Sequence, residues 1–97
     1  MNKQPAVYIL SNRPRGTLYI GVTSDLVKRI YQHREDMADG FTHKYRLKRL
    51  VYFEQHEEMT AAIAREKRLK RWRRDWKIAL IEELNPNWRD LWNDIVG

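Results

Sequence analysis

The sequence predicts an α+β domain in which helices pack on a small, mainly antiparallel sheet. Three short β-rich segments and several helical patterns follow one another in the order strand, strand, helix, strand, helix, helix, with one short helix at the end. A length of 97 residues favours a single domain over residues 1–97. Four tryptophans and five tyrosines supply much of the volume of its core.

The first two strands are predicted at residues 6–12 and 17–22, joined by a turn with the sequence RPRG. Proline and glycine are typical turn residues, so the two strands should form an antiparallel hairpin. Because side chains alternate along a strand, this hairpin can place Tyr8 and Tyr19 on the same side. Gly21, which has no side chain, is expected to leave open space beside them.

A helix is predicted from about Leu26 to Met37, after capping residues with the sequence TSD. Its apolar stripe has helical spacing and comprises Leu26, Ile30, His33 and Met37. Gly40 is expected to end this helix, together with Ala38 and Asp39, by adopting the left-handed cap conformation.

The second half of the chain is predicted to be mostly helical. A polar stretch leads into a third strand at residues 50–55, which a long helix follows at about 57–73. Another helix should begin at residue 74 or 75 and end by Leu84, before Pro86. One more short helix is predicted near the C-terminus because core spacing relates Trp88, Leu91, Trp92 and Ile95.

The net charge of +6 predicts a polyanionic partner, either nucleic acid or an anionic membrane surface. The chain has no cysteine, which excludes a disulfide framework and a cysteine-ligated zinc site. The apolar run near the N-terminus is too short for a signal peptide or a membrane span. A soluble, cytoplasmic protein is therefore expected.

Four residues early in the chain are candidates for chemistry, although each also has a plainer interpretation. Spacing alone favours Tyr8 and Tyr19 as half-buried strand aromatics. Arg29 and His33 are four residues apart and hence neighbours on one flank of the helix. Taken singly, His33 is typical of a core histidine and Arg29 of a surface cation. Their position directly after the strand of Tyr19 favours a shared site, and arginine can bind one phosphate through two hydrogen bonds.

The long helix contains seven cations and one acid between Arg65 and Arg74. That acid, Glu66, falls in the middle of the apolar stripe formed by Met59, Ala62, Ile63 and Leu69. A carboxylate on the core-facing side is costly unless it is paired, hydrogen-bonded or bound to a metal. An ion pair with one of the arginines and a site for a cation such as Mg²⁺ are equally compatible with this pattern. The other cations can bind a polyanion.

Together these residues resemble the GIY-YIG nuclease superfamily, and within it the small stand-alone proteins. The signature segment is AVY at residues 6–8, then ten residues, then YIG at 19–21, with Ala6 in place of the usual glycine. SDLVKRIYQH resembles the following helix with its arginine, and AAIAREKRLKRW resembles the helix with the metal-binding glutamate. The resemblance extends over about residues 6–92 and implies a three-stranded antiparallel sheet flanked by helices.

The resemblance implies metal-assisted hydrolysis of a phosphodiester in nucleic acid, and it favours DNA over RNA. Mg²⁺ or Mn²⁺ at Glu66 would hold the scissile phosphate, and Arg29 would neutralise its developing charge. Tyr19 or Tyr8 would position or deprotonate the attacking water, and His33 would assist the proton transfer. The candidate substrate contacts are Lys28, Lys44, Lys70 and Asn85, the last in a region, NPNW, that resembles that of a family asparagine.

Two other functions stay open. The domain could bind nucleic acid without cutting it, although a pure binder has no need of Glu66 in an apolar stripe. It could also be a protein-interaction module that uses its tryptophan-rich C-terminal helices, but Trp88 and Trp92 are expected to be buried. The sequence leaves open whether the substrate is single-stranded, branched or nicked DNA, or RNA. It also leaves open the oligomeric state and a protein partner that supplies specificity.

Overall fold

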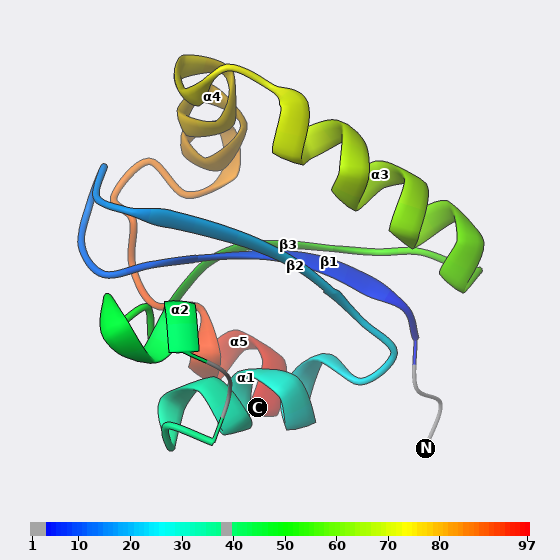
Figure 1. The fold of residues 1–97 in the computed structure, drawn as a ribbon, viewed down its shortest axis with the longest axis horizontal. Helices are drawn as coiled ribbons and strands as arrows, with labels where there is room; N and C mark the ends of the chain where they lie inside the picture. Colours follow the sequence, from blue (N-terminus) through cyan, green and yellow to red (C-terminus); the bar gives the residue numbers. More distant parts are fainter. Residues whose placement is uncertain (1–3, 38–39) are drawn as a thin grey trace.

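A three-stranded sheet lies between two layers of helices in the computed structural model, which describes residues 4–37 and 40–97 (Figure 1). Helices α3 and α4 cover one face, and α1, α2 and α5 lie on the other. The elements are β1 (Ala6–Ser11), β2 (Leu18–Thr23), α1 (Leu26–Arg34), α2 (Gly40–Lys44), β3 (Arg49–Gln55), α3 (Met59–Arg71), α4 (Arg74–Leu84) and α5 (Trp92–Val96). The predicted α+β fold is confirmed.

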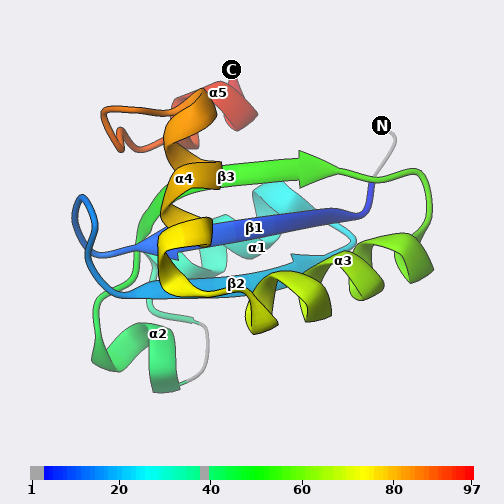
Figure 2. The same ribbon diagram turned by 90° about the horizontal axis from the view of Figure 1, so that it is seen from above.

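The strand order is β2-β1-β3, and both pairings are antiparallel. The central strand, β1, is buried along its whole length, which explains its nearly continuous apolar sequence. The predicted hairpin of β1 and β2 forms, and its register places Tyr8 opposite Gly21 and Leu10 opposite Tyr19. Strand β2 is therefore a free edge of the sheet, and α3 runs along its side (Figure 2).

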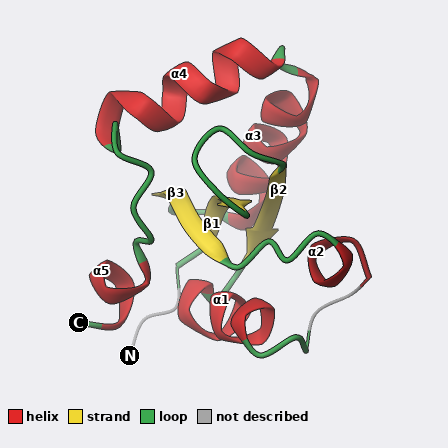
Figure 3. Cartoon of the chain, turned by 90° about the vertical axis from the view of Figure 1, so that its left-hand side faces the viewer, coloured by secondary structure: helices red, strands yellow, loops and turns green. Residues whose placement is uncertain are grey.

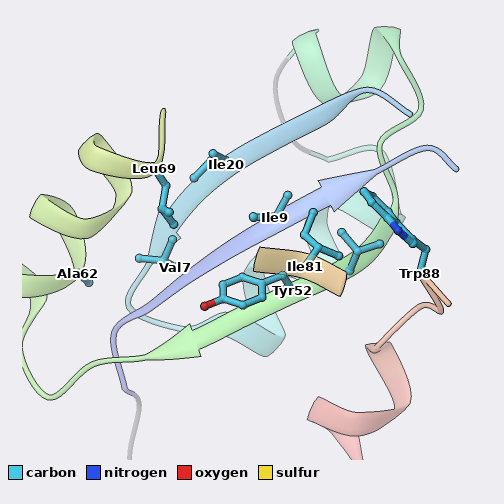
Figure 4. Close-up of a cluster of buried hydrophobic side chains, with 9 residues drawn as sticks. Val7, Ile9, Ile20, Tyr52, Ala62, Leu69, Ile81 and Trp88 are labelled. Atoms are coloured by element: carbon cyan, nitrogen blue, oxygen red, sulfur yellow. The ribbon is translucent and has the colours of Figure 1, made fainter. Parts of the chain in front are cut away.

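Alternation of side chains gives the sheet two apolar faces, because odd and even positions of β1 point opposite ways. Val7 and Ile9 join the core under α3 and α4 (Figure 4), which also contains Ile20, Val51, Tyr52, Ala62, Leu69, Ile81 and Trp88. Tyr8 and Leu10 join the core on the other face, which also contains Ala6, Leu26, Ile30, Leu47 and Leu50. Full burial of one such aliphatic side chain contributes about 1.5–3 kcal/mol.

The first helix is shorter than its sequence pattern predicts. It ends at Arg34, and Met37, expected in its apolar stripe, is 65% exposed. The chain leaves the helix through Asp36, which has a left-handed backbone with φ of 57°. The predicted cap at Gly40 is wrong: no described glycine has a positive φ, and Gly40 is the first residue of α2. The other two residues of that prediction, 38 and 39, lie outside the described part of the chain.

Helix α2 was not predicted from the sequence, which shows only a polar stretch there. Five residues are too few for a periodic pattern to be detected. The helix is fixed by its surroundings: Thr42 is buried, and the backbone N–H of Leu47 donates to the carbonyl oxygen of Thr42. Figure 3 shows α2 beside α1, on the β2 side of the sheet.

The C-terminal segment crosses from one layer of helices to the other (Figure 3). The predicted burial of Trp88 is confirmed, since it is 2% exposed and its indole N–H donates to Glu82. Leu91, Trp92 and Ile95 are partly buried against the core on the α1 side. Trp88 is therefore not available as a surface anchor. Among the described helices, none is long and apolar enough to span a membrane.

Candidate active site

Four predicted site residues meet on the face of the sheet that α1 covers. The Tyr8 hydroxyl lies 3.0 Å from Nε2 of His33, and Nε of Arg29 donates to the same hydroxyl at 3.4 Å. The ring of Tyr19 lies 6.3 Å from that of Tyr8 and 5.8 Å from that of His33, measured between centroids. We call Tyr8, Tyr19, Arg29 and His33 the tetrad.

The hairpin and the first helix explain this meeting. Tyr8 and Tyr19 point to the same side, as predicted, because both occupy the same set of alternating positions in paired strands. Gly21 makes room for the ring of Tyr8, and does not leave the open space that the sequence predicts. A Cβ atom there would lie 2.4 Å from both Cζ and the hydroxyl oxygen of Tyr8. The space predicted to be open beside Gly21 is thus filled by the Tyr8 ring.

The tetrad has an inner and an outer part. Tyr8 and His33 are buried, at 1% and 3% exposed, whereas Tyr19 and Arg29 are partly exposed. A bound molecule therefore reaches Tyr19 and Arg29 first. The buried pair is suited to hold Arg29 and to accept or pass on a proton, because it is linked by a hydrogen bond and shielded from bulk water.

Two further residues complete the hydrogen bonds of the site, and sequence reasoning missed both. Nδ1 of His33 lies 3.2 Å from Oγ1 of Thr42, which is itself buried in α2. Nη1 of Arg29 donates to the side-chain oxygen of Gln32 at 3.2 Å. Gln32 could have been found from its spacing of three residues from Arg29 on a helix. Thr42 had no such signal, because α2 itself was not predicted.

A row of aromatic rings leads from the tetrad to the surface. The Phe41 ring lies 6.0 Å from that of Tyr19, and the Tyr45 ring lies 4.9 Å from that of Phe41. Phe41 and Tyr45 are 47% and 42% exposed. We call Tyr19, Phe41 and Tyr45 the aromatic row. Exposed rings beside a cationic site are typical of proteins that stack unpaired bases.

Glu66 lies in α3, across the sheet from the tetrad. Its neighbours on the helix stripe, Ala62 and Leu69, are fully buried against the other face of the sheet. The Glu66 side chain is 12% exposed and forms an ion pair with Nζ of Lys70 at 2.9 Å. Helix α3 packs on β2, the strand of Tyr19, and on β1, the strand of Tyr8, from the face opposite to the tetrad (Figure 1).

The donor set near Glu66 fits a metal ion that the substrate helps to bind. Among the described residues, no three histidine, aspartate or glutamate side chains are grouped as metal ligands. Mg²⁺ is commonly held by one or two carboxylates, with water and substrate phosphate completing its coordination. The present partner of the carboxylate is Lys70, whose side chain is 53% exposed and free to move into solvent. Glu66 thus fits a one-carboxylate site.

The predicted substrate-binding lysines lie in three different places. Lys28 is exposed on α1, at the turn capped by Asp25. Lys44 is exposed at the end of α2, with its Nζ 5.4 Å from the centroid of the Tyr45 ring. Lys44 is therefore part of the surface around the aromatic row, and Lys70 is next to Glu66. Direct contact of these lysines with substrate stays a prediction.

Asn85, the fourth predicted substrate contact, is engaged with the backbone. It is 6% exposed, and its side-chain nitrogen donates to the carbonyl oxygens of Val51 and Arg89. Its side-chain oxygen accepts from the backbone N–H of Arg89. These bonds fasten the end of α4 to β3 and to the C-terminal segment. The observed contacts of Asn85 are thus structural, and a contact with substrate stays a prediction.

Comparison with known proteins agrees with this geometry. The family described as GIY-YIG catalytic domain matches residues 4–79. The chain belongs to the GIY-YIG family. The matched range contains the whole tetrad and Glu66 but ends before Asn85. In this GIY-YIG chain, Ala6 takes the place of the first signature glycine, where it is fully buried in the central strand.

The GIY-YIG chain is similar to several small proteins named UPF0213. One from Staphylococcus saprophyticus is 34% identical over 77 residues, which cover 79% of this chain and 93% of the relative. Another, from Haloquadratum walsbyi, is 32% identical over 83 residues, which cover 86% of this chain and 92% of the relative. No solved structure matches. The relatives are of similar size, which agrees with the prediction of a stand-alone GIY-YIG protein.

Proposed function

We propose that the protein is a metal-dependent endonuclease that hydrolyses phosphodiester bonds in DNA. The observation that supports this most directly is the hydrogen-bonded cluster of Arg29, Tyr8 and His33, with Tyr19 beside it at the surface. A module that only binds nucleic acid through charge needs no buried tyrosine–histidine pair behind its arginine. Membership of the GIY-YIG family supports the same nuclease assignment.

The hydrogen-bond chain defines how the buried residues act. Arginine has only donors, so the N–H of Arg29 donates to the Tyr8 oxygen. The Tyr8 hydroxyl can then donate its proton to Nε2 of His33, and in that tautomer the histidine proton is on Nδ1, facing Thr42. In this arrangement Tyr8 can release a proton to His33, and Arg29 stabilises the negative charge left on the tyrosine oxygen.

The outer residues meet the substrate. The guanidinium of Arg29 can donate two hydrogen bonds to the scissile phosphate and neutralise the charge that develops on it. The partly exposed Tyr19 is placed to position the attacking water. Glu66 would hold the divalent cation, in place of its ion pair with Lys70. When bound, Mg²⁺ or Mn²⁺ supplies Lewis-acid polarisation of the phosphate and stabilises the leaving oxygen.

The aromatic row favours a substrate with unpaired bases. Phe41 and Tyr45 present exposed rings next to the tetrad, and stacking on such rings requires bases that are free of a duplex. Single-stranded DNA, or the single-stranded part of a branched molecule, meets this requirement. A cytoplasmic location and a partner protein that supplies further specificity are predictions from the sequence that accompany this proposal.

One observation favours the competing function, binding without cutting. The Glu66 carboxylate is already neutralised by Lys70, which is how a purely structural buried acid would be accommodated. The two functions differ in what removal of the carboxylate does. A nuclease needs Glu66 for its metal, whereas a binding module loses only an ion pair.

Cleavage assays with matched variants test the proposal. Labelled single-stranded, duplex and branched DNA, and single-stranded RNA, are incubated with wild type in Mg²⁺, in Mn²⁺ and in EDTA. Glu66→Gln and Arg29→Ala are compared with Glu83→Gln, which removes an exposed carboxylate of α4. We expect metal-dependent cutting of single-stranded DNA that falls at least about 100-fold in the first two variants and is unchanged in the third.

Circular dichroism and a binding assay accompany these reactions. Folded variants that bind DNA without cutting it support the assigned roles. Cutting in EDTA, or normal cutting by Glu66→Gln, would show that the metal assignment is wrong. Binding by the wild type without any cleavage would leave the protein as a nucleic-acid-binding module.

A further inference from the structure

A second cationic site lies at the end of the sheet, away from the tetrad's hydrogen bonds. It is a pocket of about 380 Å³ lined by residues next to the end of β1 and the start of β3. Its charged lining comprises Arg34, Glu35, Arg46, Lys48, Arg49 and Asp90. Four cations against two acids predict an anionic ligand.

Two of the four cations are available to a ligand. Arg34 is paired with Asp90 at 2.7 Å, and Lys48 with an aspartate outside the pocket at 3.0 Å. By contrast, neither Arg46 nor Arg49 has a carboxylate within 4 Å anywhere in residues 4–37 and 40–97. The charges that are not compensated by the protein itself therefore belong to these two arginines.

Arg49 is held in place with half of its guanidinium unused. Nη1 donates to the carbonyl oxygen of Trp88 at 3.0 Å, which fixes the plane of the group. Its Nε is buried and has no hydrogen-bond partner among the described residues. A buried donor without an acceptor is unusual in a folded protein and requires an explanation. Nη2 also has no hydrogen-bond partner among the described residues and, unlike Nε, is not buried, so it is the donor that a ligand can reach.

Arg46 occupies a backbone position that disfavours any side chain. Its φ is 56°, in the left-handed region where glycine is preferred. It follows directly after Tyr45 and the end of α2. The backbone N–H groups of Arg46 and Leu47 donate to the carbonyl oxygens of His43 and Thr42, so this φ is that of a residue that caps the C-terminus of α2. The cap turns the chain so that Arg46, next to the aromatic row in sequence, lines the pocket together with Arg49.

We propose that this pocket binds a phosphate group of the nucleic-acid strand whose bases stack on the aromatic row. This inference rests on the proposed function for the source of the phosphate, but the pocket's affinity for phosphate does not depend on catalysis. Arg49 binds the phosphate through Nη2, and Arg46 supplies the second charge. The site fixes the strand at a second point and so sets which phosphodiester reaches Arg29.

The Arg49 side-chain N–H gives a direct measurement. A protein labelled with ¹⁵N is titrated in EDTA with inorganic phosphate, with chloride at equal ionic strength, and with oligothymidylate bearing either a 5′-phosphate or a 5′-hydroxyl. We expect phosphate and both oligonucleotides, but not chloride, to shift the Arg49 Nε–H signal. Stronger binding of the 5′-phosphate would identify a strand end as the ligand, and equal binding an internal phosphodiester.

Arg46→Gly and Arg49→Gln are the test variants. The first removes a cation and relieves the backbone strain, so it should fold at least as well as wild type. Each should weaken oligonucleotide binding roughly tenfold, since hydrogen bonds to charged groups have about this effect. Arg15→Gln, which removes an exposed cation that is paired with Glu82 and lies outside the pocket, is the matched control. Amide spectra verify that each variant is folded.

The outcomes separate this inference from the proposed function. If Glu66→Gln abolishes cleavage but leaves the Arg49 shift intact, the pocket and the active site are independent. An unchanged Arg49 signal, or equal weakening by Arg15→Gln, would overturn the phosphate site and leave the nuclease proposal standing. A shift with inorganic phosphate but none with oligonucleotides would overturn the link to the strand.

Discussion

At the scale of single residues, the active-site face depends on the absence of a side chain at position 21. Gly21 lies opposite Tyr8 in the hairpin, and the Tyr8 ring occupies the volume that a Cβ atom would need. The Tyr8 side chain is buried, and its hydroxyl contacts both His33 and Arg29. The glycine therefore sets the position of the Tyr8 hydroxyl, and through it that of Arg29.

Substitution of this glycine tests that dependence. We expect Gly21→Ala to lower the free energy of unfolding by about 1–3 kcal/mol, the usual cost of overpacking, and to reduce cleavage strongly. Gly40→Ala is the control, because a Cβ atom there has nothing within 4 Å and alanine favours a helix. Urea unfolding and the cleavage assay measure both effects. Equal stability of the two variants would contradict the packing argument.

At the scale of elements, α2 links the catalytic face to the surface. One side of this five-residue helix presents Thr42 to His33, and the other carries Phe41, whose ring continues the aromatic row. A segment this short has little helical stability of its own, so its tertiary contacts must hold it in place. The same element thus orients a buried histidine and offers rings for stacking.

The stacking role of α2 predicts a selective loss of binding. Phe41→Ala and Tyr45→Ala should each weaken the binding of single-stranded DNA by about 1–3 kcal/mol, the usual range for stacking of one base on an aromatic ring. Duplex binding, which depends on charge, should change little. Tyr31→Ala is the control, since Tyr31 is a 50% exposed aromatic of α1 outside the row. Fluorescence anisotropy measures the DNA affinity of wild type and the three variants. If Tyr31→Ala weakens the binding of single-stranded DNA as much as the other two, the aromatic row is not a specific stacking site.

At the scale of the whole molecule, a polar cluster joins β3 to α3, in the layer of helices that covers one face of the sheet. The carboxylate of Glu54 accepts hydrogen bonds from Tyr52 and Arg65 and lies 2.7 Å from Nε2 of His56. Burial by itself would raise the pKa of the Glu54 carboxyl, but the bonds from Tyr52, His56 and Arg65 outweigh it and lower the pKa. Burial and Glu54 together raise the pKa of Tyr52 to about 12, so Tyr52 stays neutral and donates.

This cluster predicts how stability depends on pH. Because the folded state lowers the pKa of Glu54, its stabilisation is present above the unfolded pKa of about 4.3 and is lost as pH falls through the folded pKa. Glu54→Gln should have a lower free energy of unfolding than wild type at pH 7. When the pH falls below about 4.3, its free energy of unfolding should decrease less than that of wild type. Urea unfolding across this range is compared with Glu83→Gln, an exposed control. If the free energy of unfolding of wild type and of Glu54→Gln changes with pH in the same way, Glu54 does not contribute to the pH dependence of stability.

The sequence by itself determined the parts that follow from local periodicity. Alternation along two strands places Tyr8 and Tyr19 on one side, and helical spacing makes Arg29 and His33 neighbours. Both patterns depend only on residues near one another in the chain, and the structure confirms both. The same is true of Glu66, whose place in the apolar stripe follows from the helix repeat and agrees with its low exposure.

The tertiary structure decided what depends on residues far apart in the chain. The contact of Tyr8 with His33 spans 25 positions, and the pairing of Asn85 with Val51 spans 34. Local patterns carry no information about such contacts, so the hydrogen bonds of Asn85 to the backbone could not be predicted from the sequence. Helix α2 was missed for the same reason, because packing against the first helix, and not its own sequence, makes it fold.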